Sequence, residues 1–232
     1  MTKMKNTQVS HQRFNFDEED ESQIQQRLLP YTVQSKVQNI FRFKIDEFFD
    51  EPRYYRNVTD ICLQAQEDDQ IHFHLNSGGG SVSALNTCLD AISRTDAITV
   101  AVIQGDCHSA ASILALHCDF VDVGLYATML CHHASYPIPF QKAADVESMV
   151  QHYSENLRDL MQETYEGFMT PSEIQEMLDG KQFYMNSKEI VARLEARDEY
   201  FDAQVQALAE EAAVEASKPV SKPTKKTTKQ KE

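Results

Sequence analysis

The chain has 232 residues, 41% of them hydrophobic, and a formal net charge of −14. This size and composition fit one domain of ordinary size plus tails. The negative charge argues against general nucleic-acid binding, which requires a basic face. No apolar run approaches the ~18 residues of a membrane span, and the N-terminus lacks the apolar segment of a secretory signal. We therefore expect no membrane contact and a cytoplasmic location.

Polar sequence lies at both ends of the chain. Residues 1–36 are predicted to form a polar N-terminal extension with one short helix at Ser22–Leu29, and residues 214–232 a disordered, lysine-rich tail. The domain itself is expected at 37–213. Its cysteines are odd in number and show no paired framework, which favours free thiols. They are Cys62, Cys88, Cys107, Cys118 and Cys131.

Hydrophobic periodicity predicts alternating strands and helices in the first half of the domain. The expected strands are Asn39–Ile45, Ile71–Leu75, Ile98–Ile103, Phe120–Val123 and Thr128–Cys131. The expected helices are Pro52–Glu67, Ser81–Ser93 and Ser109–His117. This order indicates an α/β fold made of parallel βαβ units with right-handed crossovers.

Helical patterns dominate the second half. A long amphipathic helix is expected over Ala143–Phe168. A helix capped by Thr170 follows and ends at Gly180, because threonine caps helix starts and glycine helix ends. An extended piece at Phe183–Met185 then leads into a last helix that runs toward Ala213.

A glycine loop and a serine carry the chemistry that the sequence suggests. Gly78, Gly79 and Gly80 follow a buried-strand pattern, and glycines leave the backbone N–H groups accessible. Ser109 begins a helix of small residues, whose first N–H groups lack intrahelical partners. Together they predict an oxyanion site beside a hydroxyl nucleophile, as serine acyl transfer requires.

Such a serine needs a base, and histidine is the usual one. His108 is adjacent and should point away from Ser109, whereas His117 lies about 12 Å along the helix. His132 and His133 follow a strand that ends at the functional edge of a parallel sheet, so one of them can reach Ser109. A third group that orients the histidine is expected within residues 178–184.

Other interpretations of these residues compete. Ser109 suits a helix N-cap, and Ser112 is expected to pack inward. The neighbouring histidines and cysteines allow zinc binding, but none has CxxC or HxxxH spacing, so we predict no metal site. His72 and His74 share one face of a strand and are expected to be structural.

Four segments resemble the proteolytic subunit of the Clp protease (ClpP) family, within the ClpP/crotonase superfamily. LNSGGGSVSA (75–84) is similar to the family's INSPGGSVTA, with Gly78 in place of proline, and GDCHSAASILAL (105–116) is similar to GxAASxA. TMLCHHA (128–134) is similar to RVMIHQP, and KQFYMNSKEI (181–190) to DxFMSAEEA. The resemblance spans roughly residues 39–197 and is closer to divergent, often phage-encoded members.

The resemblance implies a serine endopeptidase without a cofactor. It assigns Ser109 as nucleophile, His132 as base, and Gly79, Gly80 and Ala110 as the oxyanion hole. Gln182 stands where the family has its catalytic aspartate, and the nearby Asp179 is the alternative third group. Glutamine can bond a histidine but lacks the charge that stabilises an imidazolium, a loss worth on the order of 10⁴ in rate in a comparable change.

The resemblance also implies a ClpP/crotonase-like ββα spiral with a protruding handle helix at residues 143–168. Homo-oligomeric rings would then enclose the active sites and take polypeptide substrates. Burial of this helix within its own chain is the alternative to burial against a partner. The N-terminal segment does not match the family's axial loops, which argues against docking to an unfoldase ATPase.

Two rival functions remain open. The first is a catalytically degenerate, non-enzymatic assembly subunit, which the glutamine at position 182 motivates. The second is a crotonase-type acyl-CoA enzyme, in which paired N–H groups stabilise a thioester enolate. That chemistry would leave Ser109 and His132 without a role, and the glycine loop has no evident glutamate pair beside it.

Overall fold

A computed structural model describes residues 38–46, 51–134 and 143–216. The chain divides into two units, residues 1–37 and 38–232, and only the second contains described residues. The predicted helix at Ser22–Leu29 and the tail beyond residue 216 therefore lie outside the described residues. The predicted domain limits stay a prediction.

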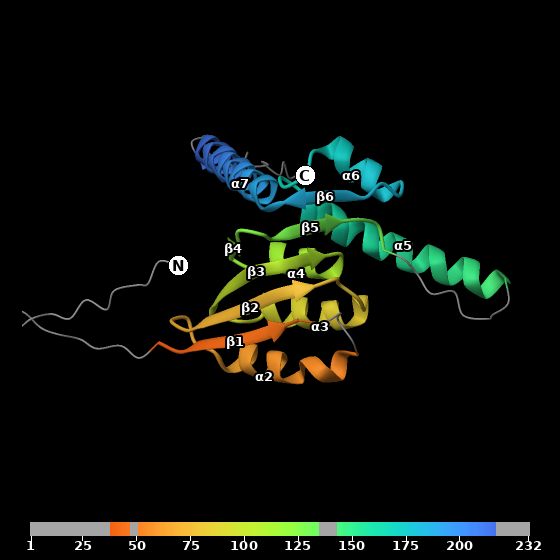
Figure 1. Cartoon of the computed structure of the whole chain (residues 1–232). Helices are drawn as coiled ribbons and strands as arrows, with labels where there is room; N and C mark the ends of the chain where they lie inside the picture. The colour runs from red at the N-terminus through yellow and green to blue at the C-terminus, as the bar shows by residue number, and fades with distance from the viewer. Residues whose placement is uncertain (1–37, 47–50, 135–142, 217–232) are drawn as a thin grey trace, which may run out of the picture. The chain divides into compact units, whose positions relative to one another are not determined.

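The described strands form a single six-stranded sheet in the order β1-β2-β3-β5-β6, with β4 paired to β3 (Figure 1). The strands are β1 (Ile40–Ile45), β2 (Gln70–Ser77), β3 (Ile98–His108), β4 (Phe120–Val123), β5 (Thr128–Cys131) and β6 (Phe183–Asn186). The pairs from β1 to β5 are parallel, as the sequence predicts. The last strand, β6, is antiparallel to β5.

Strand β3 is longer than the predicted Ile98–Ile103 and runs on to His108. Its first half pairs with β4 and its last residues pair with β5. The register against β2 shifts after Leu75, and the Asn76 side chain fills this irregularity by accepting a hydrogen bond from Asp106 N–H. A Cβ on Gly105 would lie 2.3 Å from Asn76 Oδ1, so a larger residue there would displace the Asn76 side chain. The extension brings β3 directly to Ser109.

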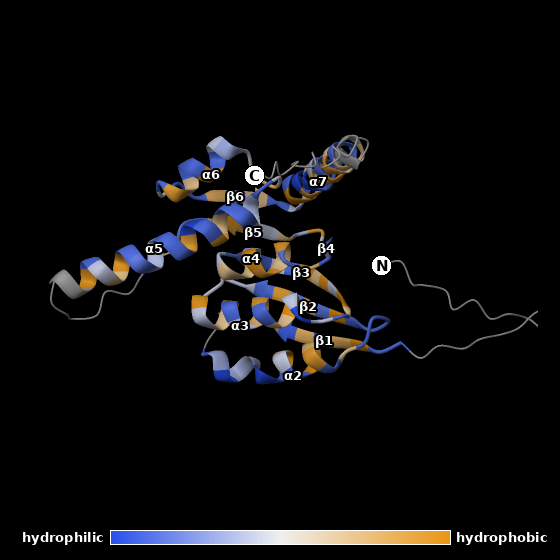
Figure 2. Ribbon diagram, turned by 180° about the vertical axis from the view of Figure 1, so that it is seen from behind, coloured by the Kyte–Doolittle hydropathy of each residue, from blue (hydrophilic) through white to orange (hydrophobic). Residues whose placement is uncertain are grey.

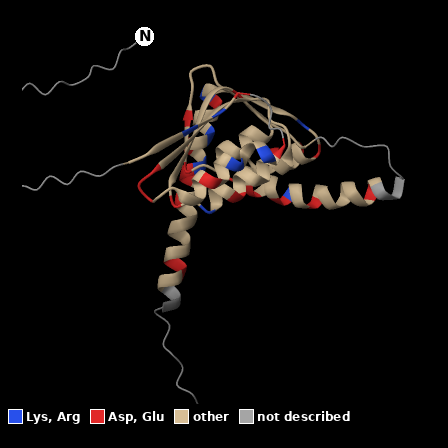
Figure 3. Cartoon of the chain, turned by 90° about the horizontal axis from the view of Figure 1, so that it is seen from below, with Lys and Arg blue, Asp and Glu red and all other residues tan. Residues whose placement is uncertain are grey.

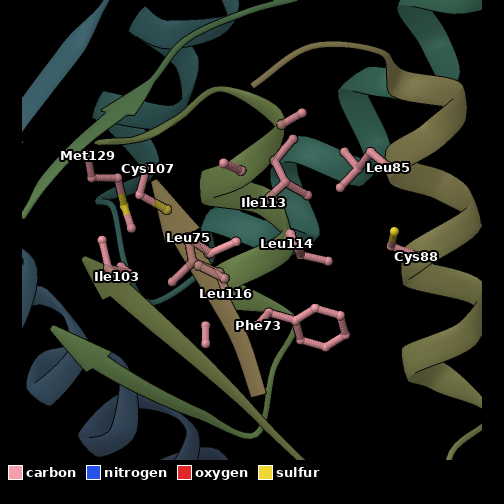
Figure 4. Packing of buried hydrophobic residues seen from close by; sticks show 14 of the residues in the cluster. Phe73, Leu75, Leu85, Cys88, Ile103, Cys107, Ile113, Leu114, Leu116 and Met129 are labelled. Carbon is pink, nitrogen blue, oxygen red and sulfur yellow. The ribbon is translucent and has the colours of Figure 1, made fainter. Parts of the chain in front are cut away.

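Three helices pack in the first half of the domain, α2 (Arg56–Gln64), α3 (Val82–Ser93) and α4 (Ala110–Leu116). The predicted helix at Pro52–Glu67 is shorter and begins with a separate 3₁₀ turn, Pro52–Tyr55. Phe73 and Leu75 of β2 point into a core shared with Leu85 of α3 and Leu114 of α4 (Figure 4). All seven residues of α4 are buried, so the helix that follows Ser109 is held rigidly beneath the sheet.

Helix α5 (Ala143–Tyr165) extends away from the sheet for half its length (Figures 1 and 2). Leu157, Met161 and Tyr165 near its C-terminal end are buried in the core, whereas Tyr153 is 52% exposed. Burial within the chain is therefore confirmed for the end of this segment, whereas burial of its outer turns against a partner stays a prediction. Its last turns pack within the chain, and its outer turns present half-covered apolar side chains.

The C-terminal elements are α6 (Pro171–Leu178), strand β6 and α7 (Ser187–Ala216). Thr170 and Glu173 form the predicted capping box, and Gly180 follows α6 with a φ of +106°. Helix α7 reaches Ala216, and its outer half exposes Val205 and Leu208. Acidic and basic residues are interspersed over the core and α5 (Figure 3). None of the described helices is long and apolar enough to cross a lipid bilayer.

Candidate active site

The glycine loop lies directly against Ser109. A Cβ built on Gly79 would be 2.6 Å from Ser109 Cβ, 2.6 Å from His108 O and 3.0 Å from Ala110 N. Gly79 also has a φ of +92°, which side-chain-bearing residues rarely adopt. The loop after β2 and the residue before α4 therefore meet at van der Waals distance, and glycine is the residue that permits this approach.

Ser109 is held in a strained backbone conformation, with φ 58° and ψ −123°. It is the one non-glycine residue with positive φ among those the structure describes. Such conformations persist only where the surroundings over-determine them, and they gather at active sites. Ser109 does occupy the N-cap position of α4, as predicted, but its hydroxyl makes no cap bond to that helix.

Ser109 is tied to the strand that carries the candidate base. Its backbone N–H donates a 2.8 Å hydrogen bond to the carbonyl of Leu130 in β5. His132 lies two residues further along the chain, just beyond the end of β5, and is half-buried. This connection sets the spacing of the nucleophile and the imidazole. Among the described residues, no hydrogen bond joins the Ser109 hydroxyl to another group.

Burial lowers the pKa of His132 below its ordinary value, and the neighbouring His133 and His108 lower this pKa further. The imidazole is therefore neutral at neutral pH, which is the state a general base requires.

His108 is turned away from Ser109, as its adjacency predicts. Its Nε2 lies 3.0 Å from the Thr128 hydroxyl, which in turn donates a 2.9 Å bond to Asp106. Since the single hydroxyl proton goes to Asp106, His108 Nε2 carries a proton and donates to Thr128. His117 bonds the carbonyl of Ile113 at the far end of α4 and lies outside the site.

The two candidates for the third catalytic group occupy different places. The ladder pairs Cys131 with Phe183, so its continuation sets Gln182 opposite His132. The Gln182 amide oxygen accepts a 2.9 Å bond from the Tyr184 hydroxyl. Asp179 is the exposed C-cap of α6 and accepts a bond from Gln175. Register therefore favours Gln182, although no described hydrogen bond joins either residue to His132.

The backbone donors of an oxyanion site border Ser109. Ala110 begins α4, so its N–H has no intrahelical acceptor. The Gly79 N–H donates a long bond of 3.2 Å to the Ser77 hydroxyl, which an incoming oxyanion would have to share. Gly80 follows with a φ of +144° and is exposed.

The sequence model of Clp protease matches residues 55–193, which is more than half of the chain. The chain belongs to the Clp protease family. No similar sequence was found among curated proteins. The α/β fold with its protruding helix α5 agrees with a ClpP-type peptidase, which confirms the predicted fold class and family.

The cysteines near the site of this Clp protease family member are buried and protonated. Burial raises the pKa of Cys131 to about 12 and that of Cys107 well above its ordinary value. Neither thiol is a ready nucleophile, because the thiolate is the reactive form. Across the described ranges, no three His, Cys, Asp or Glu side chains gather where they could hold a metal ion.

Sequence reasoning missed one buried residue next to the site. Tyr165 was expected only as a member of the apolar stripe of α5, yet its hydroxyl reaches the start of α4, 2.8 Å from Ser112 Oγ. Periodicity identifies the buried face of a helix but gives no sign of the polar end of a tyrosine. Ser112 is fully buried, as predicted.

Proposed function

We propose that this protein is a serine endopeptidase in which Ser109 is the nucleophile and His132 the general base. The observation that carries the proposal is the contact between the Gly79 main chain and the strained Ser109. It sets backbone N–H groups beside a hydroxyl that has no hydrogen-bond partner among the described residues. Membership of the Clp protease family supplies the substrate class, polypeptides.

The reaction follows from these positions. Ser109 Oγ attacks the scissile carbonyl while His132 accepts its proton, and the Ala110 and Gly79 N–H groups stabilise the oxyanion. His132 then protonates the leaving nitrogen as the C–N bond breaks. Water attacks the acyl-enzyme with His132 again as base, which restores the Ser109 hydroxyl.

Gln182 is proposed to orient His132 by accepting its Nδ1–H through the amide oxygen. This arrangement keeps the Nε2 lone pair directed at Ser109. It offers no negative charge to the imidazolium, so turnover should be slower than with a carboxylate at this position. Asp179, the exposed C-cap of α6, is the alternative third group.

The proposed working form is a homo-oligomeric ring that encloses the active sites. The half-covered apolar side chains on the outer turns of α5 support this, because such a surface is suited to burial against another subunit. Docking of an unfoldase ATPase is not part of the proposal.

A second candidate is a catalytically degenerate assembly subunit. Two observations favour it: glutamine stands in the aspartate position, and no described hydrogen bond joins Ser109 to His132. The two candidates predict opposite outcomes of the same assay.

The test is hydrolysis of a set of fluorogenic peptides by the assembled full chain. The peptidase proposal expects turnover that Ser109→Ala abolishes while the oligomer size is unchanged. Ser93→Ala is the matched control, because Ser93 is exposed and bonds only its own helical turn. Assembly without any turnover in the parent protein would support the degenerate subunit.

A further inference from the structure

A pair of hydroxyl groups is buried beneath Ser109. Ser112 of α4 and Tyr165 at the end of α5 are both fully buried, and Ser112 Oγ lies 2.8 Å from the Tyr165 hydroxyl. The side chains around them belong to the hydrophobic core. Because burying a hydroxyl in apolar surroundings is unfavourable unless it is hydrogen-bonded, these two groups depend on their partners.

The directions of the bonds can be assigned. Ser112 Oγ lies 2.7 Å from the carbonyl oxygen of Ser109 and 3.4 Å from that of Leu130. Carbonyl oxygens only accept, so the single hydroxyl proton of Ser112 goes to them. Tyr165 must then donate to Ser112. This donation polarises the Ser112 hydroxyl and strengthens its bond to Ser109.

The Ser112 hydroxyl therefore bridges the two elements that carry the candidate catalytic groups. One of its acceptors is the backbone carbonyl of Ser109, the candidate nucleophilic residue. The other is the backbone carbonyl of Leu130 in β5, the strand that leads to His132. The Ser109 N–H bonds the same Leu130 carbonyl. Tyr165 connects this bridge to α5.

We propose that Tyr165 and Ser112 are positioning residues that hold Ser109 in its positive-φ conformation and fix its spacing to β5. The proposal rests on the proposed peptidase function for its effect on catalysis. A strained residue needs surroundings that over-determine it, and a directed pair of buried hydroxyls at its carbonyl provides them. A change at the base of α5 is thereby transmitted to the nucleophile.

The first test compares Ser112→Ala, Tyr165→Phe and the double variant with the parent. Ser112→Ala leaves the Tyr165 hydroxyl without its acceptor on Ser112, so its melting temperature should fall. The double variant removes both groups and should recover much of that loss. Its kcat should nevertheless stay between about 10- and 100-fold below the parent with KM unchanged, because Ser109 is less well placed.

The matched control is Tyr200→Phe, whose exposed hydroxyl bonds Glu166 beside the end of α5. It should leave kcat and KM at the parent values. If turnover of the double variant recovers together with its stability, the pair is merely structural and the proposal is wrong.

A second measurement does not depend on turnover. Amide hydrogen exchange at Ser109, followed by NMR, should be at least about tenfold faster in the double variant than in the parent or Tyr200→Phe, since the N–H bond to Leu130 opens more often. If the parent hydrolyses nothing but this acceleration is seen, the peptidase function fails and the positioning role stands. If the parent is inactive, the proposal is wrong when exchange at Ser109 is equally fast in the double variant and the parent. If the parent is active, the proposal is wrong when the double variant has the parental kcat.

Discussion

At the scale of single residues, the site depends on one glycine and one strained serine. Gly79 allows the loop after β2 to touch Ser109, and the positive φ of Ser109 keeps its hydroxyl away from the role of a helix cap. Composition and motif order predicted that the two segments meet. They could not predict the strain, because it arises from contacts with β5 and α4 that are distant in sequence.

Gly79→Ala tests the close approach. The added methyl group would overlap Ser109 Cβ and His108 O, so we expect at least a ~100-fold loss of peptide turnover from a displaced nucleophile. Stability should fall by about 1–3 kcal/mol from backbone strain. The control is Gly180→Ala, which also has positive φ but open space around its Cβ. Equal turnover in the two variants, measured with one peptide, contradicts the account.

The pH dependence of turnover tests the state of His132. Its lowered pKa means that the imidazole stays neutral to more acidic pH, so the acid limb of kcat/KM should lie below the ordinary histidine value of 6.5. Gln182→Asp places a carboxylate opposite the ring and favours the imidazolium, which moves this limb upward and raises kcat. Profiles of the parent and variant that coincide would show that Gln182 does not face His132.

At the scale of elements, local sequence predicted most helices and strands, and tertiary contacts decided the rest. The capping box at Thr170 and the glycine after α6 are local signals, and both are present as expected. The extension of β3 was missed because it depends on Asn76 filling a register shift against Gly105. The antiparallel direction of β6 was not predicted, because the hydropathy pattern of four residues does not indicate the direction in which a strand pairs.

The ion pair between α6 and α7 gives a prediction about stability. Arg193 forms two bonds with the Glu173 carboxylate, at 2.7 and 2.9 Å, and lowers the Glu173 pKa from 4.5 to about 2. Because the Glu173 pKa is lower in the folded than in the unfolded state, the ionised carboxylate stabilises the protein at pH values above the unfolded-state pKa. This stabilisation is lost as the pH falls from about 5 to 2. Glu173→Gln should make the free energy of unfolding in urea less dependent on pH over this range.

The comparison for that measurement is Glu176→Gln, which removes an exposed pair with Lys181. Exposed ion pairs contribute little, so this variant should keep the parental pH dependence. An equal loss of pH dependence in both variants would mean that Glu173 has no special part in joining the helices.

At the scale of the whole molecule, α5 is the element that would connect the proposed assembly to the candidate site. Its outer turns carry half-covered apolar side chains, whereas its last turn delivers Tyr165 to Ser112. The family resemblance predicted the protruding helix, and the amphipathic pattern alone left open which part of it was buried. The core covers only the last turns of this helix, because the length of the helix exceeds the depth of the core.

Tyr153→Glu tests the assembly. This residue is 52% exposed on the outer part of α5, so a charge there should be tolerated by the single chain but disfavoured at a subunit interface. Light scattering after size exclusion should show a smaller particle with unchanged circular dichroism. Gln151→Glu adds the same charge at an exposed polar position and should leave the particle size unaltered. A parental size for Tyr153→Glu argues against burial of this face.

The most direct measurement of the central claim is covalent labelling of the assembled protein with a fluorophosphonate, mapped by peptide mass spectrometry. We expect one adduct per chain, on Ser109, which Gly79→Ala and His132→Ala suppress and Ser93→Ala does not. Reaction at another serine, or none in a folded and assembled sample, would contradict the assignment of Ser109 as an activated nucleophile beside the glycine loop.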